Sequence, residues 1–264
     1  MNRTTLLRGL LAGAGLAAIT FATADAATIW ALDTTGKIAR IDTDSRKATP
    51  AVLVTGADGS VLSMALRPAD GKLYGLTASG QLITIDPMSG VATVVAKLDK
   101  KLETGPRTTI NFNPVVDRIR VVSSNGGNWR IHPDTGAVTV DGGLKYAPDS
   151  AYAATPPMVT TGAYSNHFAG TKETALYTLD TKLGMMNVQM PPNDGIQQPR
   201  GQLGKPVPAN AGFDILSDGQ GGNTGWIVAG GALHSIDIKT GKVMTVGKIT
   251  GLAGKDVVSI AVTK

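Results

Sequence analysis

The side chains best suited to bind a ligand are a scattered set of carboxylates, amides, guanidinium groups and one imidazole. The set comprises Asn111, Asn113, Asp117, Arg118, Arg120, Asn166, His167 and Asp214. Guanidinium and amide donors together with carboxylate acceptors can hold a small polar or anionic ligand through charge-assisted hydrogen bonds. We expect these side chains to face one pocket. The alternative roles are structural: Asp117 would accept backbone N–H groups of a turn, and Arg120 would pair with an acid between sheets.

The sequence excludes several common catalytic and metal-binding arrangements. It has no cysteine, which removes thiol chemistry and thiolate metal sites, and its three histidines do not have the spacing of metal ligands. No G-x-S-x-G segment supplies a serine nucleophile. The glycine-rich run 219–223 is not followed by the helix that a phosphate-binding loop requires. The sequence therefore indicates no cofactor and no metal, and it identifies no catalytic residue.

His167 is the strongest candidate for acid–base or metal chemistry. It follows Asn166 in a long connection that the shorter repeats lack, although a histidine on a loop is often merely solvated. Together with Asp117 and Asp214 it would suit a metal-assisted hydrolase or lyase. Because no catalytic constellation is evident, we predict a non-catalytic module that binds a small polar ligand or a protein partner. The metal-assisted enzyme and a cell-surface structural protein are the alternatives.

The first 26 residues have the pattern of a cleavable signal peptide. Arg3 and Arg8 precede an uncharged, largely apolar stretch over 10–21, and Ala24-Asp25-Ala26 supplies the small residues that signal peptidase accepts. The stretch is shorter than the roughly 20 residues that span a bilayer. We expect Sec-dependent export to the periplasm or the extracellular space, with no transmembrane anchor after processing. Residues 27–264 would then form a single domain.

The processed chain would be mildly basic and long enough to bury a large core. Removal of residues 1–26 leaves 238 residues and a net charge of +4, against +5 for the whole chain. The basic residues are dispersed, so we expect no nucleic-acid partner. The chain contains 33 glycines and 14 prolines and has no amphipathic stretch of helical length after residue 26. This composition predicts an all-β fold of many short strands joined by tight turns.

A short apolar and aromatic element recurs five times and is the main evidence for the architecture. Its copies are Ile29-Trp30-Ala31-Leu32, Leu73-Tyr74-Gly75-Leu76, Ile119-Arg120-Val121-Val122, Leu176-Tyr177-Thr178-Leu179 and Trp226-Ile227-Val228-Ala229. The third copy has an arginine where the others have an aromatic. The steps of 44 to 57 residues between copies are typical of propeller blades with about four strands each. We expect the aromatic residues to pack between adjacent blades.

A second element predicts hairpin turns, and the two ends of the domain predict how the ring closes. The segments 85–90 and 236–241 place Asp and Gly at the positions that a tight turn favours. Each repeat also has an inner strand, except that residues 28–33 lack one before them and residues 257–262 have an inner-strand pattern with nothing after it. We therefore predict a five-bladed β-propeller closed by pairing the C-terminal strand with the N-terminal blade, rather than a solenoid or a sandwich.

The segment Asn111-Phe112-Asn113-Pro114-Val115-Val116-Asp117-Arg118-Ile119-Arg120-Val121-Val122 resembles a motif of exported bacterial proteins classed as a domain of unknown function. The segments 166–170, 191–195 and 212–214 also match that family's pattern, and the likeness covers essentially all of residues 27–264. The resemblance implies an exported, propeller-like fold with no assigned activity. In the family's pattern an Asp is frequent in the middle of the inner strand. Asp214 keeps this residue, whereas Asn111 and Ala65 depart from it.

Overall fold

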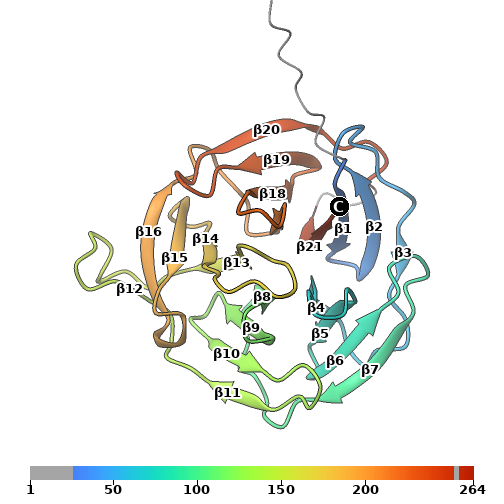
Figure 1. Ribbon diagram of the computed structural model, residues 1–264, viewed down its shortest axis with the longest axis horizontal. Coiled ribbons are helices and arrows are strands. Elements are labelled where there is room, and N and C mark those ends of the chain that lie inside the picture. Colours follow the sequence, from blue (N-terminus) through green and yellow to red (C-terminus); the bar gives the residue numbers. More distant parts are fainter. Residues whose placement is uncertain (1–25, 253–255) are drawn as a thin grey trace, which may run out of the picture.

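The computed structural model describes residues 26–252 and 256–264, which form five β-sheets arranged as propeller blades around a central axis (Figure 1). The innermost strand of each blade contacts the innermost strands of the two adjacent blades, so the ring is continuous. The predicted signal peptide lies outside the described residues except for residue 26. No helix in the described part of the chain has the length and apolarity needed to cross a membrane.

Four of the blades take consecutive segments of the chain, with strands ordered from the axis outward. Blade 2 contains β4 (Val61–Leu66), β5 (Leu73–Thr77), β6 (Gln81–Ile85) and β7 (Ala92–Lys97). Blade 3 contains β8 (Thr108–Asn113), β9 (Arg118–Ser123), β10 (Asn128–Ile131) and β11 (Val138–Val140). Blade 4 contains β13 (Val159–Tyr164), β14 (Leu176–Asp180), β15 (Met185–Gln189), the 3-10 helix η1 (Pro192–Asp194), β16 (Ile196–Gln202) and an outer parallel strand, β12 (Lys145–Tyr146). Blade 5 contains β17 (Ala211–Ser217), β18 (Asn223–Ala229), β19 (Ala232–Ile236) and β20 (Val243–Lys248).

Blade 1 combines segments from opposite ends of the domain. Its strands from the axis outward are β21 (Val257–Thr263), β1 (Thr28–Asp33), β2 (Lys37–Asp42) and β3 (Val52–Leu53). β21 pairs antiparallel with β1, and Thr28 lies opposite Thr263. This pairing confirms the prediction of a five-bladed propeller that is closed by the C-terminal strand.

The recurring aromatic position lies on the second strand of each blade and contacts a core shared with a neighbouring blade. Its aromatic members are Trp30, Tyr74, Tyr177 and Trp226. Each packs in or against a different apolar cluster, and each cluster contains residues of two adjacent blades. The fifth interface, between blades 3 and 4, has only a small cluster of Val122, Leu144 and Val159. Arg120 occupies the aromatic position there, so this interface depends on polar contacts.

The turns between third and fourth strands form through the Asp and Gly residues that the sequence repeats. Asp86 Oδ1 accepts the backbone N–H of Met88 at 2.9 Å, and Gly90 has a φ of 77°, where a side chain would be strained. Asp237 accepts the N–H of Lys239 in the same way at 2.8 Å. These backbone hydrogen bonds lower the pKa of both carboxyl groups.

Candidate functional site

Two of the predicted site residues meet between the innermost strands. Asn111 Nδ2 on β8 donates to Asp214 Oδ1 on β17 at 3.2 Å, and both side chains are buried. Asn111 Oδ1 accepts the N–H of Tyr164 on β13, and Asp214 Oδ2 accepts the N–H of Val262 on β21. The pair therefore links the inner strands of blades 3, 4, 5 and 1. These polar atoms are used to hold the ring together.

Burial raises the pKa of Asp214 to about 6 from an ordinary value of 3.8, although hydrogen bonds from Val262, Ile215 and Asn111 offset part of the increase. A carboxyl group whose pKa rises on folding favours the folded state when it is protonated. Its stabilising contribution is complete below pH 3.8 and is lost as the pH rises through 6. The sign is opposite to that of the turn carboxyl groups, whose pKa values are lowered.

We predict that Asp214→Asn removes this pH dependence. Between pH 4 and pH 7, the free energy of unfolding of the wild type should fall relative to that of the variant by up to about 3 kcal/mol, because each pK unit is worth about 1.4 kcal/mol. Urea unfolding of both proteins at several pH values measures this difference. Asp237→Asn, at an exposed turn, is the control: the pKa of Asp237 is lowered on folding, so its contribution changes below about pH 4 and the difference from the wild type should stay nearly constant between pH 4 and pH 7. A difference between the wild type and Asp214→Asn that stays constant from pH 4 to pH 7 would contradict the prediction.

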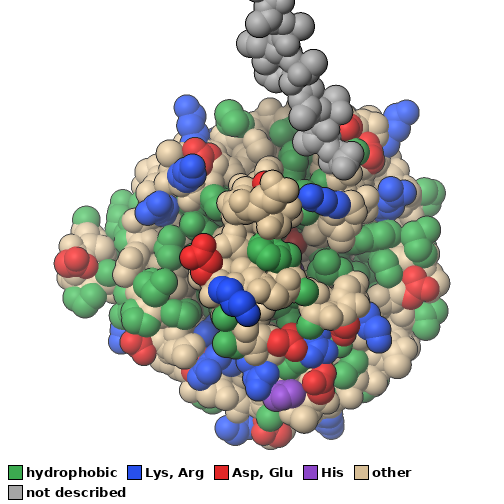
Figure 2. All heavy atoms as spheres, in the orientation of Figure 1, with side chains coloured by type: hydrophobic (Ala, Val, Ile, Leu, Met, Phe, Trp, Pro, Cys, Tyr) green, Lys and Arg blue, Asp and Glu red, His purple; other side chains and the backbone are tan. Residues whose placement is uncertain are grey.

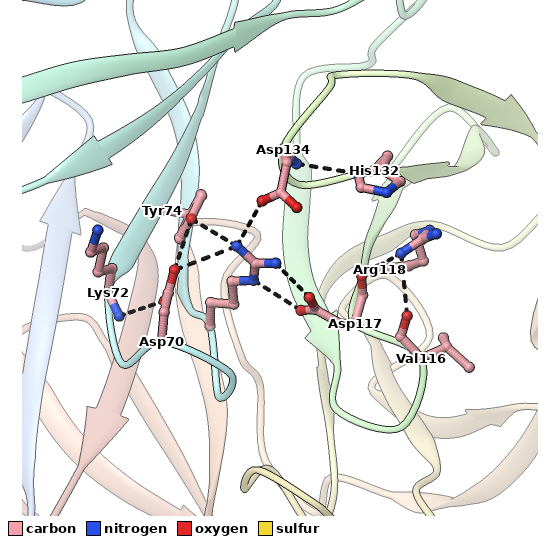
Figure 3. Close-up of polar contacts among 9 residues, drawn as sticks. Asp70, Lys72, Tyr74, Val116, Asp117, Arg118, His132 and Asp134 are labelled. Atoms are coloured by element: carbon pink, nitrogen blue, oxygen red, sulfur yellow. Dashed lines mark hydrogen bonds and ion pairs between the residues drawn. The ribbon is translucent and has the colours of Figure 1, made fainter.

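Three further candidates lie at the turn between β8 and β9. Asn113 Oδ1 accepts two backbone N–H groups of this turn, which is the role expected of Asp117. Asp117 has a φ of 48°, and its carboxylate instead contacts Arg67 of blade 2 (Figure 3). The structural role expected for Asp117 was therefore wrong, because the ion pair directs its carboxylate toward the neighbouring blade. Arg118 donates to the backbone carbonyl group of Asp117 at 2.9 Å.

Arg67 forms ion pairs with carboxylates of blades 2 and 3, which Figure 3 labels as Asp70, Asp117 and Asp134. Its guanidinium group contacts Asp117, Asp134 at 2.9 Å and Asp70 at 3.4 Å, and it donates to the hydroxyl group of Tyr74 at 3.0 Å. The hydrogen bonds to Asp117, Tyr74 and Asp134 raise the pKa of Arg67. The cluster joins the ends of two adjacent blades, and its charged groups are already paired with one another.

Arg120 lies in the interface between blades 3 and 4 and pairs with an acid there, which is the structural role predicted as the alternative to ligand binding. Its side chain is 3% exposed and donates to Asp141 at 2.6 Å and to Asn193 at 2.7 Å. Arg130 pairs with the same Asp141 carboxylate at 2.8 Å. Asn193 belongs to the 191–195 turn of blade 4, so two segments that carry the family resemblance meet here. Hydrogen bonds across the interface direct the guanidinium group of Arg120 away from the axis.

The connection from β13 to β14 carries Asn166 and His167 and runs across the centre of the ring in the view of Figure 1. Asn166 has a φ of 51° and exchanges hydrogen bonds of 2.7 and 2.8 Å with Asn223 of blade 5. His167 Nε2 is buried and finds no hydrogen-bond partner among the described residues. Burial lowers the pKa of His167 to about 4, so its imidazole is neutral at pH 7.

The charged side chains on the face of the molecule shown in Figure 2 are dispersed rather than concentrated. Figure 2 shows Lys and Arg interspersed with Asp and Glu on the face that it displays, without an extended patch of one sign. Such a face offers no continuous basic track for a nucleic acid. Within the same residues, no three His, Asp or Glu side chains lie close enough together to hold a metal ion.

Arg107, immediately before β8, is the site residue that the sequence analysis missed. It is 7% exposed, and Nε has no hydrogen-bond partner in the described part of the chain. Its Nη2 donates to the backbone carbonyl group of Val258 on β21, and no described carboxylate forms an ion pair with it. Burial lowers the pKa of Arg107, yet a guanidinium group stays charged at neutral pH. The fold therefore holds a positive charge without a counter-charge.

Arg107 lines a cavity of about 420 Å³ at the end of the axis where the inner strands begin, here named the Arg107 cavity. The lining includes Asp33, Gly36, Ser60, Val61, Leu62, Pro106, Arg107, Asn210 and Val258. Asp33 is the one carboxylate among the lining residues, and its Oδ1 accepts the N–H groups of Thr35 and Lys37 at 2.8 and 3.0 Å. The volume falls in the range of small-molecule sites.

The segment that carries Arg107 is fixed by hydrogen bonds to the turn after β9. Gly105 N–H donates to Ser123 Oγ at 2.7 Å, and Arg107 N–H donates to Ser124 Oγ at 3.1 Å. The carbonyl group of Arg107 accepts the N–H of Ser124 at 2.8 Å. A Cβ at Gly105 would lie 2.9 Å from the backbone nitrogen of Asn125, so only glycine permits this close approach. The guanidinium group therefore extends from a rigid support.

Comparison with known proteins places the chain in a family without an assigned activity. No curated protein matches the sequence. A structural genomics protein of unknown function from Bacteroides thetaiotaomicron VPI-5482 is 17% identical with a TM-score of 0.50, and the match covers 91% of this chain and 65% of that one, less than two thirds of its length.

A protein of unknown function from Bacteroides caccae is 12% identical with a TM-score of 0.48 and coverages of 90% and 99%. An auxiliary nutrient binding protein from Bacteroides ovatus ATCC 8483 is 13% identical with a TM-score of 0.46 and coverages of 81% and 57%. At such low sequence identity a structural match shows a similar fold and nothing about function. The sequence model of the domain of unknown function DUF4394 matches residues 47–261, most of the chain. The protein therefore belongs to the DUF4394 family.

Proposed function

We propose that this protein is a non-catalytic binding module that holds the anionic group of a small molecule at Arg107. The observation that carries the proposal is a buried guanidinium group with an unpaired N–H beside a cavity. An uncompensated buried charge costs several kcal/mol of stability. An anion in the cavity would supply the missing counter-charge through charge-assisted hydrogen bonds to the guanidinium group. The pattern of residues 1–26 supports a further proposal, that this binding takes place in the periplasm or outside the cell.

The contacts of the candidate acids favour binding over metal-assisted hydrolysis or elimination. Asp214 is hydrogen-bonded to backbone and amide groups between the inner strands, and Asp117 is paired with Arg67 at the blade 2–blade 3 contact. His167 belongs to a different blade from either acid. A shared metal would need these side chains to leave the bonds that hold the blades together.

We predict that Arg107→Met abolishes anion binding and makes the protein more stable. The methionine fills a similar apolar volume without an unpaired charge, so the free energy of unfolding should rise by about 1 kcal/mol or more. The Arg107 Nε–H resonance in a ¹⁵N-correlated NMR spectrum reports binding directly. Titration with sodium acetate or inorganic phosphate should shift that resonance to saturation in the wild type.

Arg200→Met is the matched control, since it removes one exposed positive charge on β16. It should leave the acetate titration unchanged. The proposal would be wrong if neither acetate nor phosphate produced a saturable shift of the Arg107 resonance. It would also be wrong if Arg107→Met were less stable than the wild type and still bound either anion.

A further inference from the structure

A second cavity lies next to the Arg107 cavity. It has a volume of about 310 Å³, and we name it the leucine cavity after its apolar lining residues Leu62, Leu76, Ala78, Leu98 and Leu102. The rest of the lining consists of Thr77, Ser79, Gly80, Lys97, Lys100, Lys101 and Thr104. Leu62 lines both cavities. The segment before β8 also borders both, because Leu102 and Thr104 face the leucine cavity while Pro106 and Arg107 face the other. The two cavities therefore share one lining residue and are bordered by the same segment, residues 102–107.

The lining of the leucine cavity suits a saturated hydrocarbon group. Its apolar members are aliphatic, and among the described lining residues no aromatic ring offers a stacking surface for a sugar or a base. Lys97, Lys100 and Lys101 also line it. Lys100 Nζ donates to the carbonyl group of Val138 at 3.0 Å, and Lys101 pairs with Glu103 at 3.3 Å, so part of this positive charge is already engaged.

We propose that the ligand is an alkyl carboxylate, with its carboxylate group on Arg107 and its hydrocarbon chain in the leucine cavity. The inference rests on the proposed function for the anionic group of the ligand, which binds Arg107. It adds that the rest of the ligand is a hydrocarbon chain. The carboxylate matches the fork of donors on a guanidinium group. Binding buries the aliphatic surface of the hydrocarbon chain and of the leucine cavity away from water, which is the main source of affinity for an apolar ligand.

The experiment measures the affinity of a homologous series by titration calorimetry. Acetate, butanoate, hexanoate and octanoate should bind with affinities that rise about fourfold for each added CH₂, because burying one CH₂ is worth about 0.8 kcal/mol. Ala78→Trp fills the leucine cavity from an exposed turn position and should abolish this rise while acetate still binds. Ala169→Trp introduces the same side chain at an exposed position in the β13–β14 connection, and the rise should remain.

The outcomes separate the two proposals. If acetate binds through Arg107 but octanoate binds no more tightly, the alkyl carboxylate is wrong and the anion-binding function stands. If neither a member of the series nor inorganic phosphate binds, the proposed function fails as well, whereas binding of phosphate alone would refute only the alkyl carboxylate. Octanol is the further probe: binding of octanol as tight as that of octanoate, and equal in Arg107→Met, would overturn the role of the carboxylate.

Discussion

Deletion of residues 257–264 is expected to give a protein that does not fold. The deletion removes β21, whose side chains Val257, Val258, Ile260 and Val262 are each less than 10% exposed. Burying one such side chain is worth about 1.5–3 kcal/mol, so four of them approach the whole free energy of unfolding of a domain, roughly 5–15 kcal/mol. The deletion also removes the hydrogen bonds of Ser259 to Met64 and leaves β1 without its inner partner.

Circular dichroism and the dispersion of NMR resonances measure the loss of the fold. A synthetic peptide of residues 256–264 added to the truncated protein should restore both signals, whereas a scrambled peptide should not. This complementation shows that the truncated chain lacks only the strand. A truncated protein that melts within a few degrees of the full-length protein would show that β21 does not close the ring.

Arg120→Met should be the most damaging single substitution considered, with a loss of about 3–5 kcal/mol in the free energy of unfolding. The substitution removes donors to Asp141, Asn128 and Asn193 at one interface. The other four interfaces each have a large apolar cluster, whereas the one between blades 3 and 4 has three clustered apolar residues. Arg120→Trp restores the residue type of the other repeats and should also destabilise the protein, because the buried acceptors on Asp141 and Asn128 lose the donors of Arg120. They would keep only the hydrogen bonds from Arg130 and Gln189.

Arg130→Met is the matched control in urea unfolding. Arg130 pairs with the same carboxylate, yet its side chain is 35% exposed against 3% for Arg120. A partly exposed ion pair contributes about 1 kcal/mol or less, so Arg130→Met should cost far less than Arg120→Met. Equal losses for the two variants would show that the hydrogen bonds of Arg120 to blade 4 do not stabilise the interface.

The architecture was predictable because every blade meets the same physical requirements. An aromatic residue such as Tyr74 or Tyr177 fills the gap between adjacent sheets, and an Asp such as Asp86 binds the N–H groups of a tight turn. These requirements recur at the spacing of one blade and so are visible in a single sequence. The unmatched inner strand at residues 257–262 then predicted which sheet closes the ring.

The candidate site was only partly predictable, because the pattern of a strand does not say which neighbouring blade a side chain meets. The inner-strand pattern placed Asn111 and Asp214 near the axis, but their bond depends on the relative positions of blades 3 and 5. Arg107 belongs to no motif. Its one signal was comparative: the residues directly before the five inner strands are Ser60, Arg107, Met158, Asn210 and Asp256, and Arg107 alone is basic.

The pairing of β1 with β21 also dictates the order in which the molecule can be completed. Blades 2 to 5 each form from one continuous segment of the sequence. Blade 1 cannot be completed until residues 257–263 are present to pair with β1. Contacts between such distant residues slow folding, and meanwhile the edge of β1 stays open to pairing with other chains. The edge of β1 therefore stays available for aggregation until residues 257–263 have joined the sheet.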